Sequence, residues 1–164
     1  MKPSIHEVAR DLPGRLFILP KPSGDRLAAD LAHIRGLGVD RLVSLLEPDE
    51  ASDLGLAAEA QAAARAGLRF VQHPVADYGL PDPAPFEALA AELTRAIAAG
   101  EGVAAHCRAG IGRSGMLTAL ILAPFAGSAE AAMARVSAAR NMPTPDTEAQ
   151  RRYIVDAAPR LIRP

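Results

Sequence analysis

The chain has 164 residues, enough for one domain with a sizeable core, and its formal net charge of −1 gives no general attraction for nucleic acid or an anionic membrane. A single cysteine excludes an internal disulfide and a multi-cysteine metal site. No apolar run approaches the ~20 residues of a membrane span, and the N-terminus lacks a signal-peptide pattern, so we expect a single cytoplasmic domain over residues 1–164.

The first part of the chain gives a weak pattern. Residues 1–14 are mixed in character, and we expect them to form an irregular arm. After this arm, short apolar runs bounded by Pro, Gly or charged residues predict strands. The predicted strands span residues 15–19, 40–46, 68–75 and 102–105.

Segments rich in alanine and leucine alternate with these strands and predict helices. We expect Ser23 or Asp25 to cap the first helix, and Asp146 or Thr147 to cap the last. The predicted helices span about residues 23–35, 53–66, 84–99, 115–122, 128–140 and 146–157, with Pro159 after the last one.

The alternation of strands and helices predicts an α/β fold, with a central, mainly parallel sheet of four to five strands flanked by helices. In such folds ligands bind beyond the carboxyl ends of the strands. Three loops follow predicted strands: one begins at Glu47, one contains Asp77, and one spans residues 106–114. We therefore expect these three loops to share one edge of the sheet.

Residues 106–114 read His-Cys-Arg-Ala-Gly-Ile-Gly-Arg-Ser and lie between a predicted strand and a predicted helix. The first N–H groups of a helix are unpaired and carry partial positive charge, and glycines let the backbone curl so that several N–H groups meet at one centre. Arg113 adds a planar fork suited to phosphate oxygens. This positive field favours the Cys107 thiolate, to which Ser114 can donate a hydrogen bond.

The pattern of His106-Cys107, five residues and then Arg113-Ser114 resembles the signature loop of the cysteine-dependent protein tyrosine phosphatases, in the form of their compact dual-specificity branch. The resemblance runs from Leu16 to about Ile154. It implies a dual-specificity phosphatase-like fold and a hydrolase of phosphate monoesters that uses a cysteinyl-phosphate intermediate and needs no metal or cofactor. The implied phosphate-binding residues are Arg108, Ala109, Gly110, Ile111, Gly112 and Arg113.

A phosphatase of this kind needs a general acid to protonate the leaving oxygen. Asp77 is the first candidate, because it follows a predicted strand thirty positions before Cys107 and because residues 75–81 resemble the acid-bearing loop of the dual-specificity enzymes. Asp82, five positions further on, is the alternative. Either carboxylate can instead cap a turn or the next helix.

Three further residues have supporting roles that the resemblance suggests. Gln150 lies where relatives place a glutamine that orients the hydrolytic water, although most glutamines on helices are simply solvated. Glu47 can hold the Arg113 guanidinium in a bidentate pair, or cap a helix, or face solvent. His106 corresponds to a histidine that holds the loop in relatives without transferring protons.

Other functions remain as alternatives. A sulfurtransferase usually spaces its Cys and Arg more closely than Cys107 and Arg113, and a non-catalytic phosphate-binding module usually loses the Cys, the Arg or the acid. A phosphoinositide or small phosphate-ester phosphatase is also possible. Lipid phosphatases carry extra lysines in the loop, where this chain has Arg108 and Ile111, so we expect a phosphorylated protein or small aryl phosphate to enter a shallow site on a monomer.

Overall fold

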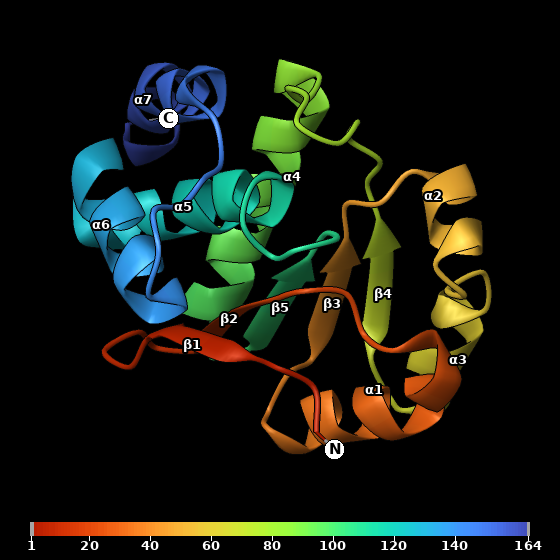
Figure 1. The fold of residues 1–164 in the computed structure, drawn as a ribbon. Helices are drawn as coiled ribbons and strands as arrows, with labels where there is room; N and C mark the ends of the chain where they lie inside the picture. Colours follow the sequence, from red (N-terminus) through yellow and green to blue (C-terminus); the bar gives the residue numbers. More distant parts are fainter. Residues whose placement is uncertain (1, 164) are drawn as a thin grey trace.

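The computed structural model describes residues 2–163. Its centre is a five-stranded sheet with the strand order β1-β2-β5-β3-β4 (Figure 1). The last four strands in this order are parallel to one another, and β1 pairs with β2 in the antiparallel sense. The strands are β1 (His6–Ala9), β2 (Arg15–Leu19), β3 (Arg41–Ser44), β4 (Arg69–Gln72) and β5 (Gly102–His106).

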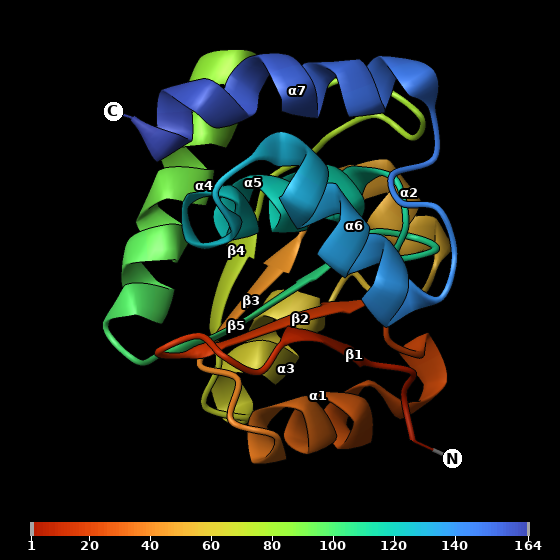
Figure 2. The same cartoon turned by 90° about the vertical axis from the view of Figure 1, so that its left-hand side faces the viewer.

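Helices cover both faces of this sheet, as Figure 2 shows, with α4 to α7 on one face and α1 and α3 on the other. A short 3-10 turn, η1, covers Gly24–Arg26. The helices are α1 (Leu27–Gly36), α2 (Pro48–Asp53), α3 (Glu59–Arg65), α4 (Pro83–Ala98), α5 (Arg113–Ala126), α6 (Ala129–Arg140) and α7 (Glu148–Ile162). The predicted fold class is confirmed.

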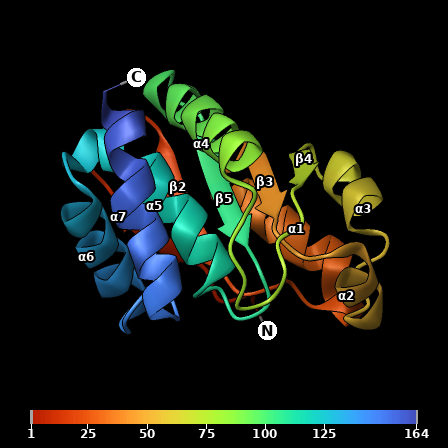
Figure 3. The same ribbon diagram turned by 90° about the horizontal axis from the view of Figure 1, so that it is seen from above.

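The alternation of side chains along β2 separates two apolar cores. Leu16 and Ile18 face the larger core beneath α4 to α7, whereas Phe17 and Leu19 face the smaller core with α1 and α3. The helix α5 is the centre of the larger core: its residues 113–123 are all buried, and it packs against α4, α6 and α7 (Figure 3). This burial holds the N-terminal end of α5 firmly against the sheet.

Three sequence predictions were wrong in detail. Within the predicted irregular arm 1–14, residues 6–9 form β1, which pairs with β2 and so covers an edge of the sheet. The predicted helix 53–66 begins only at Glu59, because the chain turns at Gly55, which has φ +74° and packs closely against Gly24; a separate helix, α2, precedes this turn. The last helix continues through Pro159 to Ile162.

No helix within residues 2–163 is long and apolar enough to cross a membrane.

Candidate active site

The loop between β5 and α5 lies at the carboxyl edge of the parallel strands, as the sequence predicts (Figure 1). Its outer carbonyl oxygens are bound by neighbouring groups. The Lys21 N–H donates to the Arg108 carbonyl at 3.1 Å, and Arg140 donates from Nε to the Gly110 carbonyl at 2.9 Å and from a terminal nitrogen to that of Ala109. Because each N–H lies opposite the preceding carbonyl in a trans peptide, these contacts turn the loop amides inward.

Both loop glycines lie close to neighbouring segments, Gly110 against backbone and Gly112 against side chains. Gly110 has φ +73°, and a Cβ there would lie 2.5 Å from backbone atoms of Leu19 and Pro20. A Cβ on Gly112 would lie 2.6 Å from Asp146 Oδ2 and 3.1 Å from Gln150 Oε1. A side chain at Gly110 would therefore push the loop off the sheet, whereas a side chain at Gly112 would have to displace the ends of the Asp146 and Gln150 side chains.

Cys107 lies at the base of this loop and is 3% exposed. Its Sγ is 3.1 Å from Ser114 Oγ, so the hydrogen bond expected from the sequence is present. Cys107 also lies within electrostatic reach of Arg113 and Arg140. A thiolate at this position would face two cations and one hydroxyl donor.

The Arg113 guanidinium is buried, with 1% of the residue exposed. It forms a bidentate pair with Glu50 at 2.7 and 2.9 Å and donates to the Val75 carbonyl at 2.9 Å. Burial opposes its charge, but the hydrogen bonds that it donates to Glu50, together with the charges of Cys107, Glu50 and Asp77, raise the pKa of Arg113 above its usual value. Its Nε is buried and has no hydrogen-bond partner within residues 2–163.

The prediction that Glu47 holds Arg113 was wrong, because Glu50 does so. Glu47 is the N-cap residue of α2, and its N–H donates to Glu50 Oε1 at 3.3 Å. The two glutamates are three positions apart, which is nearly one helical turn. The first turn of α2 therefore presents Glu50, and not its cap residue, to the guanidinium.

Asp77 lies in the loop between β4 and α4, and its Oδ1 is 3.2 Å from a terminal nitrogen of Arg113. Its side chain is 44% exposed, so it is open to solvent on the side away from the loop. Asp82 lies at the N-cap of α4, and its charge acts on His73. Of the two candidate acids, the structure brings Asp77 to the signature loop.

Gln150 is fully buried, so it is not a solvated helix residue. Its Nε2 donates to the Gly79 carbonyl and its Oε1 accepts from the Thr147 N–H, both at 3.3 Å. It thereby joins the Asp77 loop to the start of α7 and contacts Gly112.

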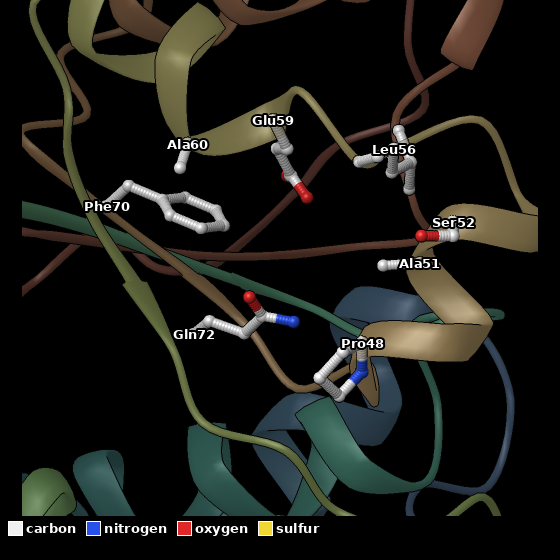
Figure 4. A pocket seen from close by; sticks show the side chains of 9 residues that line it. Pro48, Ala51, Ser52, Leu56, Glu59, Ala60, Phe70 and Gln72 are labelled. Atoms are coloured by element: carbon white, nitrogen blue, oxygen red, sulfur yellow. The ribbon is translucent and has the colours of Figure 1, made fainter.

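His106 is buried beneath the loop. Its Nδ1 is 3.1 Å from the Cys107 carbonyl oxygen, which can only accept, and its Nε2 is 2.6 Å from Glu59 Oε2. Glu59 reaches His106 from a pocket of about 160 Å³ between α2, α3 and β4, where Glu59, Phe70 and Gln72 point toward one another (Figure 4).

Sequence analysis missed Glu50, Glu59 and Arg140. Glu59 and Arg140 belong to helices outside the three predicted site loops, whereas Glu50 lies at the end of the loop that begins at Glu47. Each meets the site only when its helix packs beside it. No local pattern distinguishes Glu59 from other glutamates in alanine-rich helices, so its buried contact with His106 has no signal in the sequence. Glu50 has a weak signal, because it lies one turn after Glu47 and on the same loop–helix junction.

The fold and the arrangement of thiol, hydroxyl, guanidinium and carboxylate around one loop define a cysteine-based phosphatase of the dual-specificity class. The chain belongs to the family described as "Polymorphic toxin system, DSP-PTPase phosphatase", whose model matches residues 21–126. No curated protein sequence matches the chain.

Solved structures share the fold at low sequence identity. Kinase associated phosphatase (KAP), with its catalytic-site cysteine substituted by serine, matches with a TM-score of 0.87 and 20% identity over 100% of this chain and 98% of its own. Tk-PTP in its active form matches with a TM-score of 0.78 and 22% identity over 96% and 98% of the two chains. PTPMT1 in complex with PI(5)P matches with a TM-score of 0.77 and 17% identity over 96% of each chain.

Proposed function

We propose that residues 107–114 form the catalytic loop, with Cys107 as nucleophile, Arg113 and the loop amides as the phosphate site, and Asp77 as general acid. The observation that carries this proposal is the buried Arg113. Its guanidinium is held by Glu50 and Val75, close to the Cys107 thiol, and it retains a buried Nε–H for a further acceptor. A phosphate oxygen is the acceptor that best suits the planar set of N–H donors on this guanidinium.

In the first step, Cys107 Sγ attacks phosphorus, an S–P bond forms, and the P–O bond to the leaving group breaks. Asp77 gives its proton to the leaving oxygen. The loop amides and Arg113 stabilise the charge on the three remaining phosphoryl oxygens.

In the second step, water attacks the cysteinyl-phosphate and one of its protons passes to the Asp77 carboxylate. The S–P bond breaks, and the electron pair returns to sulfur as a thiolate. Ser114, 3.1 Å from Sγ, donates a hydrogen bond that stabilises this thiolate. Neither step calls for a metal ion. The sequence prediction that Gln150 orients the water stays a prediction.

For the substrate, we propose a phosphorylated protein or a small aryl phosphate on a shallow, permissive site. Tyr78 and Leu80, beside Asp77, are 68% and 51% exposed and offer apolar contacts at the mouth. A phosphoinositide is the second candidate, because the structurally similar PTPMT1 has been solved in complex with PI(5)P. Arg108 is exposed at the loop and suits either anion, whereas Ile111 adds no charge.

We also propose that the chain acts as one phosphatase domain, as a monomer, in the cytoplasm. A reducing compartment suits a nucleophilic thiol, which oxidation would inactivate. Light scattering of the purified protein tests the monomer, and a mass of two chains would contradict it.

Hydrolysis of p-nitrophenyl phosphate tests the assigned residues. We expect Cys107→Ser to abolish turnover, because the covalent intermediate cannot form. We expect Asp77→Asn to lower kcat by about 10²–10⁴-fold, while inorganic phosphate still binds. The matched control is Asp82→Asn, which should retain wild-type kcat because Asp82 lies at the start of α4. Wild-type turnover in Cys107→Ser would overturn the assignment.

A substrate panel separates the candidate functions. Phosphotyrosine and phosphothreonine peptides should be hydrolysed with kcat/KM values of the same order if the site is shallow. A clear preference for phosphoinositide vesicles would favour the second candidate. Transfer of sulfur from thiosulfate to cyanide, without phosphatase activity, would instead identify a sulfurtransferase. Phosphate binding without either activity would identify a non-catalytic module.

A further inference from the structure

The second chemical step needs a water molecule held in line with the S–P bond, on the side of the phosphoryl group opposite Cys107. The loop that carries Asp77 and the start of α7 lie side by side near the signature loop (Figure 2), and the Gln150–Gly79 hydrogen bond joins them. The side chains of these two segments are therefore the ones that can hold the water.

Gln150 is poorly suited to this task. It is fully buried, and each end of its amide is bound to the main chain: Nε2 to the Gly79 carbonyl and Oε1 to the Thr147 N–H. These contacts use Gln150 to fasten the Asp77 loop to α7. A reorientation toward water would break both of them.

The Asp146 side chain lies closer to Gly112 of the signature loop than the Gln150 side chain does. Its Oδ2 would lie only 2.6 Å from a Cβ on Gly112, so the carboxylate rests directly against the signature loop. Thr147 caps α7, because its Oγ1 accepts from the Gln150 N–H at 3.1 Å. Asp146 is thus not needed as a cap, and it makes no hydrogen bond or salt bridge within residues 2–163.

The charges around Asp146 are those of the proposed site. Partial burial and the nearby Asp77 carboxylate raise the pKa of Asp146 above its usual range, and Arg113 opposes this shift. Asp146 therefore shares an electrostatic environment with the proposed general acid and with the phosphate-binding arginine.

We propose that Asp146 positions the water that hydrolyses the cysteinyl-phosphate, an inference that rests on the function proposed above. One O–H of the water donates to the Asp146 carboxylate, and the other faces Asp77, which lost its proton in the first step. The water oxygen forms a bond to phosphorus and Asp77 takes the second proton. The S–P bond breaks, and the products are the Cys107 thiolate and inorganic phosphate.

Rapid-mixing kinetics with p-nitrophenyl phosphate test this role, because nitrophenol release reports the first step and steady turnover reports the slower of the two. For Asp146→Ala we expect a burst of about one nitrophenol per enzyme at the wild-type rate. Steady turnover should then be about 10²-fold slower. Mass spectrometry of the acid-quenched variant should find one phosphoryl group on Cys107.

Two further variants make the result specific. Asp146→Asn keeps an oxygen acceptor and should retain more of the second step than Asp146→Ala. Glu148→Ala removes a neighbouring exposed carboxylate from the first turn of α7 and should leave both steps unchanged. If Asp146→Ala unfolds, the burst and steady rates of Asp146→Asn provide the test.

The outcomes separate this inference from the proposed function. Equal losses in burst and steady turnover, or no loss in either, would overturn the role of Asp146 and leave the phosphatase assignment intact. Turnover by Cys107→Ser would overturn the phosphatase assignment, and with it the inference.

Discussion

Arg113 is a buried cation that two neighbours hold in one orientation. Glu50 binds both terminal nitrogens of the guanidinium, and the Val75 carbonyl accepts from one of them. A buried charge that loses its bidentate partner is costly, because the remaining neighbours do not replace both lost hydrogen bonds. Glu50 therefore serves both the folded state and the geometry of the phosphate site.

For this residue pair we predict that Glu50→Gln lowers the free energy of unfolding by ~3 kcal/mol and raises KM for p-nitrophenyl phosphate. The amide keeps an oxygen for the Glu47 N–H but removes the bidentate carboxylate, which leaves the guanidinium with only the half-exposed Asp77 as an opposite charge. Urea unfolding and steady-state kinetics measure the two effects. Glu47→Gln is the matched control and should change KM little. A larger effect from Glu47→Gln would show that the wrong carboxylate has been assigned.

The helix α6 positions the signature loop from behind. Its last residue, Arg140, donates to the carbonyls of Gly110 and Ala109, and it also contacts His6 of β1. Burial lowers the pKa of Arg140, and the Cys107 charge opposes that shift. The end of α6 thus turns the loop carbonyls outward, which leaves the amides for the phosphate.

For the end of α6 we predict that Arg140→Met weakens inhibition by inorganic phosphate by about tenfold, which corresponds to a loss of ~1.4 kcal/mol in its binding free energy. The loop amides would lose their alignment when the carbonyls are released. The inhibition constant against p-nitrophenyl phosphate measures the effect. Arg135→Met, on the same helix, removes an exposed pair with Asp11 and should leave the inhibition constant unchanged. Equal weakening by both variants would mean that the stability of α6 matters and the loop contacts do not.

Ion pairs link distant parts of the whole molecule. Glu50 pairs with Arg113, Glu87 with Arg160, and Glu101 with Arg41. In each case hydrogen bonding to the arginine lowers the pKa of the glutamate below its usual value of 4.5. A carboxylate whose pKa is lower in the folded state stabilises the fold above its unfolded-state pKa, and this contribution is lost as the pH falls through the folded-state pKa.

For these three ion pairs we therefore predict a contribution to stability that changes little between pH 7 and about pH 5 and falls steeply below about pH 4.5. The urea midpoint measured against pH tests this. Glu87→Gln should reduce the loss of stability on acidification, because residue 87 no longer titrates in its pair with Arg160. Glu130→Gln, a carboxylate outside these three pairs, should leave the shape of the curve unchanged. A stability that rises on acidification would contradict the prediction.

The sequence by itself determined the α/β architecture and the place of the proposed catalytic loop. Both depend on local signals: apolar runs of strand length, helical periodicity, and a Cys, two glycines and an Arg within residues 107–113. The position of Asp77 also followed, since the carboxyl ends of parallel strands share an edge. These properties need only neighbouring residues and one topological rule.

The tertiary structure alone decided which side chains surround that loop. The partners Glu50, Glu59 and Arg140 lie 63, 47 and about thirty positions from the residues they contact. Apart from the nearness of Glu50 to Glu47, nothing in their own segments marks them. The place of Asp146 against Gly112 depends likewise on how α7 packs on α5. Such contacts are set by the packing of whole helices, whose energy is spread over many apolar side chains, so no short stretch of sequence contains them.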